Sequence, residues 1–219
     1  MRLLGDLFRN NQEWAQRTES HTPGFFERLA EQQAPQYFWI GCADSRVPAN
    51  EIVGLMPGEI FVHRNVANVV NPFDPNCGAC LHYAVEVLRV KHVMVVGHYG
   101  CGGIRAVLDG EYRGNVGEWL APVRAIHQKY GAYLDGDHQA QWKTLSELNV
   151  VEQTAAVWNS PVVQEAWSAG RELAVHGWIY SVRDGLLRDL NVTVTSGADG
   201  DEVRKRALDD ILGARARQR

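Results

Sequence analysis

Two short apolar runs constrain the fold of this chain most. Residues 36–42 read QYFWIGC and residues 92–98 read HVMVVGH, and neither run alternates polar with apolar side chains. Continuous runs of this length are typical of strands that are buried on both faces of a parallel sheet. The segment 77–90 between them carries apolar residues at helical spacing. A strand, a helix and a second strand in this order predict a parallel α/β sheet.

Other segments extend this pattern. Further strands are expected at residues 59–68 and 173–182, with an alternating edge strand at 191–196. Helices are expected in the first thirty-odd residues, from residue 104, and over 116–130 and 142–158. The sequence therefore predicts an α/β protein with a mostly parallel central sheet flanked by helices.

The length and composition suit one folded domain. The chain has 219 residues, of which 45% are hydrophobic, and it contains neither an internal repeat nor a low-complexity linker. We expect a single domain over residues 1–219. It would include an N-terminal helical arm over about 1–34 and a C-terminal helix and tail over about 204–219.

Charge and cysteine content exclude several classes of protein. A net charge of -4 argues against a nucleic-acid partner. No apolar stretch approaches the roughly 18 residues of a membrane span, and charges interrupt the N-terminal apolar residues, unlike a secretory leader. The four cysteines are therefore expected to be reduced. We expect a cytoplasmic protein without membrane or nucleic-acid partners.

Metal-binding side chains follow two of the predicted strands. Cys42 and Asp44 lie in GCADSR, and His98 and Cys101 lie in GHYGCGG. The carboxyl ends of parallel strands meet at one edge of a sheet, so these side chains are expected to be neighbours. Any one of them could be an ordinary core cysteine or a hydrogen-bonded histidine. Two thiolates, an imidazole and a carboxylate together predict a tetrahedral zinc site.

Asp44 and Arg46 suggest how such a site could do chemistry. The Asp44 carboxylate could complete the zinc coordination, or it could pair with Arg46 and leave that position to water. In the second state Asp44 would orient a hydroxide at the metal or accept its proton. The alternative is a surface ion pair without a function.

Three motifs together resemble the β-carbonic anhydrases. CADSR, FVHRNVAN and GHYGCGG occur in that order, and the similarity runs from about residue 3 to residue 211. The resemblance implies reversible hydration of carbon dioxide to bicarbonate and a proton. It implies one zinc ion bound by Cys42, His98 and Cys101, with Asp44 as fourth ligand in a closed state. Asp44 and Arg46 would be the catalytic pair in the open state.

The resemblance also implies self-association. Members form dimers, often paired into tetramers, with N-terminal helices wrapped over the partner and a substrate pocket lined partly by the neighbouring subunit. The positions that match this pocket are Gln33, Phe61, Val66, Tyr83 and the backbone at Gly102. From the residues alone, Phe61, Val66 and Tyr83 would indicate core or interface packing.

A regulated subclass is suggested by three further residues. Trp39, Arg64 and Tyr180 match positions at which a second, non-catalytic bicarbonate favours the closed zinc site. All three side chains can donate hydrogen bonds to an oxyanion. The alternative is that Trp39 and Tyr180 are core aromatics and that Arg64 pairs with an acid.

Other functions remain open at this point. A closed structural zinc protein, which could also sense bicarbonate, would have no use for Arg46 beside Asp44. A related lyase acting on carbon disulfide or carbonyl sulfide would use the same metal ligands. A redox protein could be built on Cys77 and Cys80, although no second CxxC follows them. The tryptophans, Trp119 and Trp142 among them, are expected only to pack.

Overall fold

The computed structural model describes residues 3–71 and 73–216, so residues 217–219 of the expected tail lie outside it. The chain divides into two compact units, Met1–Ala34 and Pro35–Arg219. The first unit contains α1 (Gly5–His21) and α2 (Phe25–Glu31), which confirms the helices of the expected arm. Within it, the Trp14 and Phe26 rings meet edge to face. The single domain over residues 1–219 stays a prediction.

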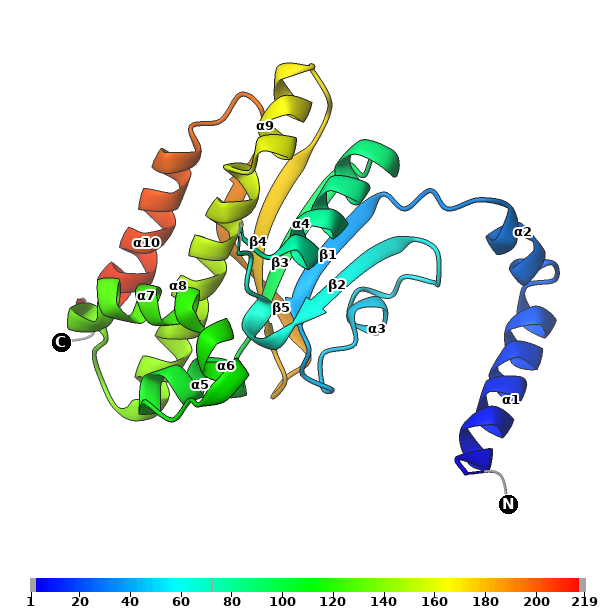
Figure 1. Cartoon of the computed structure of the whole chain (residues 1–219), viewed down its shortest axis with the longest axis horizontal. Helices are drawn as coiled ribbons and strands as arrows, with labels where there is room; N and C mark the ends of the chain where they lie inside the picture. The colour runs from blue at the N-terminus through cyan, green and yellow to red at the C-terminus, as the bar shows by residue number, and fades with distance from the viewer. Residues whose placement is uncertain (1–2, 72, 217–219) are drawn as a thin grey trace. The chain divides into compact units, whose positions relative to one another are not determined.

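The second unit is built on a five-stranded sheet with the order β2-β1-β3-β4-β5 (Figure 1). The first four strands in this order are parallel, and β5 runs antiparallel to β4. The mostly parallel α/β fold is thus confirmed. The strands are β1 (Tyr37–Cys42), β2 (Ile60–Asn65), β3 (His92–His98), β4 (Ala174–Ser181) and β5 (Leu186–Val194).

Helices connect and cover the strands. They are α3 (Ala49–Val53), α4 (Pro75–His82) with its π-helical extension (Tyr83–Val87), α5 (Gly102–Asp109), α6 (Gly114–Trp119), α7 (Ala121–Tyr130), α8 (His138–Trp158), α9 (Pro161–Ser168) and α10 (Gly200–Ala216). Short 3-10 turns lie at Val66–Asn68 and Gly131–Tyr133. α8 is central, because it contacts β3, β4, β5 and α10.

The pleat of β1 separates two cores. Phe38 and Ile40 point to the face covered by α4, α8 and α10. Trp39, between them, points to the opposite face, where Met94 and Val96 pack with α3. The strands are therefore apolar on both faces, which explains their continuous apolar sequence.

Glycine allows α8 to approach the sheet closely. A Cβ on Gly97 of β3 would lie 2.4 Å from Val150 Cγ2, and a Cβ on Gly177 of β4 would lie 2.8 Å from Thr154 Oγ1. A larger residue at either position would push α8 away from the sheet.

Several expected element boundaries are wrong, among them the start of α8, which was expected at residue 142 and lies at His138. The strand expected over 59–68 ends at Asn65, because Ala67 adopts a left-handed φ of 66°. The helix expected over 116–130 is divided at Leu120, since Pro122 in the first turn of α7 disfavours helical continuation. The last strand begins earlier than expected, at Leu186.

The four cysteines are free thiols, as expected. Cys77 and Cys80 lie in α4, where Cys77 is buried and Cys80 is half-buried. Burial raises the pKa of the Cys77 thiol to about 12, which disfavours the reactive thiolate of a redox motif. Among the described helices, none is long and apolar enough to cross a membrane.

Candidate metal centre

The metal centre lies where the chain path reverses direction across the sheet. From β1 the chain passes to β2 on one side, whereas from β3 it passes to β4 on the other side. Crossovers that diverge in this way open a crevice at the carboxyl ends of the two central strands. Cys42 is the last residue of β1 and His98 is the last residue of β3, so both residues lie at this edge of the sheet.

Three buried side chains bring metal donors together there. The ligand atoms of Cys42, His98 and Cys101 lie within 4.8 Å of one another, and the two sulfur atoms are 3.8 Å apart. In the part of the chain that the structure describes, no other group of three or more such residues is arranged to hold a metal. Cys101 directly precedes α5, whose N-terminus favours a thiolate.

The hydrogen bonding of His98 fits a metal ligand. Its Nδ1 lies 3.1 Å from the Tyr99 carbonyl, which can only accept, so Nδ1 carries the proton. Its Nε2 is buried and has no hydrogen-bond partner among residues 3–71 and 73–216. A buried lone pair without a partner is unfavourable, and a metal ion would satisfy it.

The two thiols titrate as a pair. The hydrogen bond from Cys101 lowers the pKa of Cys42, and the same contact, with burial, raises the pKa of Cys101. A bound metal would replace the shared proton and stabilise both thiolates. Two thiolates and one neutral imidazole at these separations suit zinc, because soft sulfur ligands disfavour magnesium and calcium.

Asp44 pairs with Arg46 beside these donors. Arg46 Nε donates to Asp44 Oδ1 at 2.9 Å, and Nη2 donates to Oδ2 at 2.7 Å. The same Oδ2 lies 3.8 Å from His98 Nε2. The Arg46 guanidinium holds the pKa of Asp44 well below its usual range, so Asp44 is a carboxylate at neutral pH.

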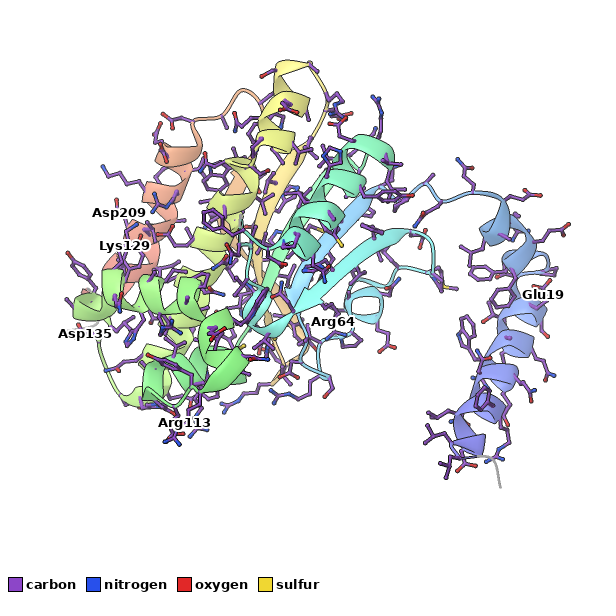
Figure 2. All side chains as sticks on the ribbon, viewed as in Figure 1. Glu19, Arg64, Arg113, Lys129, Asp135 and Asp209 are labelled. Atoms are coloured by element: carbon purple, nitrogen blue, oxygen red, sulfur yellow. The ribbon has the colours of Figure 1, made fainter. Side chains whose placement is uncertain are left out.

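Arg64 secures the backbone next to the centre. Its Nε donates to the Cys42 carbonyl at 2.9 Å, and its Nη2 donates to the Asp44 carbonyl. Arg64 lies near the carboxyl end of β2, as Figure 2 shows. Arg64 is therefore bonded to carbonyl groups, rather than to an acid as one alternative supposed.

Trp39, Arg64 and Tyr180 share one face of the sheet. Arg64 is the register partner of Gly41, which comes two residues after Trp39 and so lies on the same face. Tyr180 is the register partner of His98 in β3. A Cβ on Gly41 would lie only 2.1 Å from Trp39 Nε1. This indole nitrogen is buried, and the described residues offer it no hydrogen-bond acceptor.

Two of the residues expected in the substrate pocket lie at the centre. Gly102 directly follows Cys101. A Cβ on the next residue, Gly103, would lie 2.9 Å from Val66 Cγ1, so Val66 lies against the start of α5.

Phe61 and Tyr83 lie elsewhere in this chain. Their rings pack together with centroids 5.8 Å apart. Asn65 is the register partner of Cys42 and so marks the level of the metal centre on β2. Phe61 lies four residues before Asn65, which is roughly 13 Å along a strand. Gln33 belongs to the N-terminal unit, so its place in the pocket stays a prediction.

Two tryptophans have a role that sequence reasoning missed. Trp142 Nε1 donates to the Cys101 carbonyl at 2.9 Å, and Trp119 Nε1 donates to the Val66 carbonyl at 2.8 Å. Both were expected only to pack. Each partner is more than forty residues away in sequence, and no motif links them.

Comparisons with known proteins agree with this geometry. Residues 37–187, more than half of the chain, match the family model for carbonic anhydrase. A carbonic anhydrase of Emericella nidulans is 43% identical over 188 residues, covering 85% of this chain and 82% of that protein. One of Pseudomonas aeruginosa is 34% identical over 172 residues, covering 76% and 78%.

Solved structures share the fold. The Coccomyxa β-carbonic anhydrase in complex with acetazolamide matches with a TM-score of 0.85 and 39% identity over 89% of both chains. A tetrameric β-carbonic anhydrase of Sordaria macrospora matches with a TM-score of 0.83 and 37% identity, over 86% of this chain and 97% of that one. Together with the Cys42, His98 and Cys101 cluster, these likenesses show that the chain belongs to the β-class carbonic anhydrases and is a carbonate dehydratase that uses one zinc ion per chain.

Proposed function

We propose that Cys42, His98 and Cys101 bind the zinc ion, and that Asp44 and Arg46 are the catalytic pair for reversible hydration of carbon dioxide. When bound, zinc supplies a water of lowered pKa at neutral pH. The observation that carries the proposal is the Asp44 carboxylate, which is held by Arg46 and lies 3.8 Å from His98 Nε2, a nitrogen without a hydrogen-bond partner among the described residues.

The roles of Asp44 and Arg46 follow from their charges. Arg46 keeps Asp44 ionised and holds both carboxylate oxygens beside the metal donors, so that Asp44 can accept a hydrogen bond from the attacking water. The low pKa of Asp44 makes it a weak base. Asp44 therefore orients the water, and it releases the proton of that water again rather than remaining protonated.

The pocket for carbon dioxide is proposed to combine two subunits. Within one chain, the Val66 side chain supplies an apolar wall near the start of α5, and the backbone at Gly102 lies directly after Cys101. Phe61 lies too far along β2 to reach the same centre, and Tyr83, which packs on Phe61, is 43% exposed. We assign these two side chains, together with Gln33, to the pocket of a partner subunit.

A dimer or tetramer is proposed on the same grounds. The Sordaria macrospora enzyme that shares this fold is tetrameric. α1 has no buried residue in the single chain and exposes Leu7 and Trp14, which suits an arm that packs on a partner subunit. A cytoplasmic location, a single domain over residues 1–219, and the lack of nucleic-acid or membrane partners stay predictions.

Inhibition by bicarbonate is a second proposal, and one observation favours it. The buried Trp39 Nε1 needs an acceptor, and Arg64 on the same face can supply further donors. An oxyanion that accepts from Trp39, Arg64 and Tyr180 would draw Arg64 from the Cys42 and Asp44 carbonyls. The released segment would let Asp44 leave Arg46 and turn to the metal, which closes the site.

Stopped-flow hydration tests the main proposal. The rate is measured on zinc-quantified protein from mildly acidic to alkaline pH. Hydration that is lost in Asp44→Asn, with zinc retained, supports the catalytic pair. One zinc per chain without hydration at any pH would instead favour a structural zinc, or a lyase for carbon disulfide or carbonyl sulfide.

A further inference from the structure

A buried turn beside the metal centre is held in an unfavourable conformation. Ala67 and Asn68 have φ angles of 66° and 46°, and both residues are buried. The left-handed region is sterically costly for alanine, whereas asparagine tolerates it, so the conformation of Ala67 persists only where the surroundings impose it. The turn Val66–Asn68 therefore requires support from another part of the fold.

Two buried amides of α8 provide this support. Asn149 Nδ2 donates to the Ala67 carbonyl at 2.9 Å. Gln153 Nε2 donates to Asn149 Oδ1 at 3.0 Å, and Gln153 Oε1 accepts from the Val70 N–H at 2.7 Å. Asn149 is 1% exposed and Gln153 is 3% exposed. The turn and the residues after it are thus bonded to one long helix.

The same turn also contacts the metal centre. Ala67 packs in the same buried cluster as Cys42 and Cys101. A Cβ on Gly103 would lie 2.9 Å from Val66 Cγ1 and 3.1 Å from the Ala67 Cβ. Gly103 is the second residue of α5, directly after Cys101 and Gly102. The place of the turn therefore sets both the Val66 wall and the space available to the first turn of α5.

Other buried polar groups of α8 act differently. The hydroxyls of Thr144 and Thr154 donate to the carbonyls of Ala140 and Val150, one turn earlier in the same helix. These bonds stay within α8. The Asn149 amide instead reaches a residue that is 82 positions away in sequence.

We propose that Asn149 and Gln153 are positioning residues for carbon dioxide hydration. Through the turn they set the distance between the Val66 side chain and the metal ligand Cys101. The inference rests on the proposed function, in which Val66 forms part of the substrate pocket. Both amides are neutral, so their removal lowers activity equally across pH and leaves the midpoint of the pH profile unchanged.

The test compares three variants of the full-length, zinc-loaded protein. Asn149→Leu and Gln153→Leu remove the amides at similar volume, and Thr154→Val is the matched control on the same helix. We expect both Leu variants to lower kcat/KM per bound zinc by about tenfold, as small misplacements in active sites do, with no shift in pH midpoint. They should also speed zinc transfer to a chelator. Thr154→Val should match the wild type in both measurements.

The outcomes separate the possible explanations. If Asn149→Leu does not fold, Gln153→Leu still tests the positioning role, because Gln153 is linked to Ala67 through Asn149. The Leu variants could instead fold with wild-type kcat/KM and wild-type zinc transfer, and differ only in a lower melting temperature. The amides would then have a purely structural role. A wild type without hydration would overturn the proposed function, and the zinc-transfer comparison would still decide whether the amides act on the metal centre.

Discussion

The sulfur atoms of Cys42 and Cys101 lie 3.8 Å apart, although 59 residues separate them in sequence. The two strand ends and the start of α5 bring them there without a disulfide between them. We expect Cys42→Ser and Cys101→Ser to lose most of their zinc, because a hydroxyl is a far weaker zinc ligand than a thiolate. Zinc per chain, measured after gel filtration, tests this. Cys80→Ser is the matched control, and loss of zinc in that variant would contradict the assignment.

The Asp44 and Arg46 pair predicts a pH effect of defined sign. Asp44 has its pKa depressed in the folded protein, so the pair stabilises the fold above the unfolded pKa of about 3.9, and this stabilisation is lost as the pH falls toward the folded value. Arg46→Gln removes the guanidinium, and the Asp44 pKa should rise toward its ordinary range. Titration of the Asp44 carboxyl by NMR in both proteins measures the change. An unchanged pKa would show that Arg46 does not control Asp44.

Activity should depend strongly on the same pair. Asp44→Asn is expected to lower kcat/KM by about 10²-fold or more, because a neutral amide can neither accept the proton nor orient the water as a carboxylate does. Zinc content should remain at the wild-type level, since Asp44 is paired with Arg46 in this structure. Stopped-flow hydration with zinc quantification separates the two effects. A variant that keeps wild-type kcat/KM would remove Asp44 from the mechanism.

Bicarbonate regulation predicts a selective loss of inhibition. Trp39→Phe keeps the aromatic packing but removes the buried N–H that lacks an acceptor among the described residues. We expect its hydration rate without added bicarbonate to match the wild type, and its inhibition by bicarbonate at mildly acidic pH to disappear. Trp178→Phe, on the same face in β4, is the control and should remain inhibited. Equal inhibition of Trp39→Phe and the wild type would argue against the pocket.

The fold and the grouping of the candidate metal donors were predictable from the sequence pattern. Apolar runs mark the buried strands, and parallel strands place the residues that follow them at one edge, so Cys42 and His98 could be paired without a structure. Asp44 and Arg46 meet because they are two residues apart. The break at Ala67 was not predictable, since alanine has no preference for a left-handed φ, and its carbonyl is hydrogen-bonded by Asn149, 82 positions away in sequence. The bond from Trp142 to Cys101 depends on tertiary packing in the same way.

Close approach of α8 to the sheet predicts a large cost for one methyl group. Gly97→Ala would place a Cβ 2.4 Å from Val150 Cγ2, so the helix must shift, and we expect a loss of about 1–3 kcal/mol in the free energy of unfolding. Gly78→Ala in α4 is the control, because nothing lies within 4 Å of its Cβ and alanine favours the helix. Urea unfolding of the zinc-loaded proteins measures both. If Gly97→Ala left the free energy of unfolding unchanged, then α8 could move away from the sheet without cost.

The location of Tyr83 predicts complementation between subunits. If Tyr83 serves the pocket of the partner, then Tyr83→Ala and Asp44→Asn should each impair their own homo-oligomers. A mixed oligomer would contain one complete site, in which Asp44 of the Tyr83→Ala chain faces the intact Tyr83 of the Asp44→Asn chain. Co-expression with two affinity tags isolates this species, and its hydration rate per zinc should exceed those of both homo-oligomers. If Tyr83 acts within its own chain, both chains of the mixed oligomer carry a defective site, and the rate stays between those of the two parents.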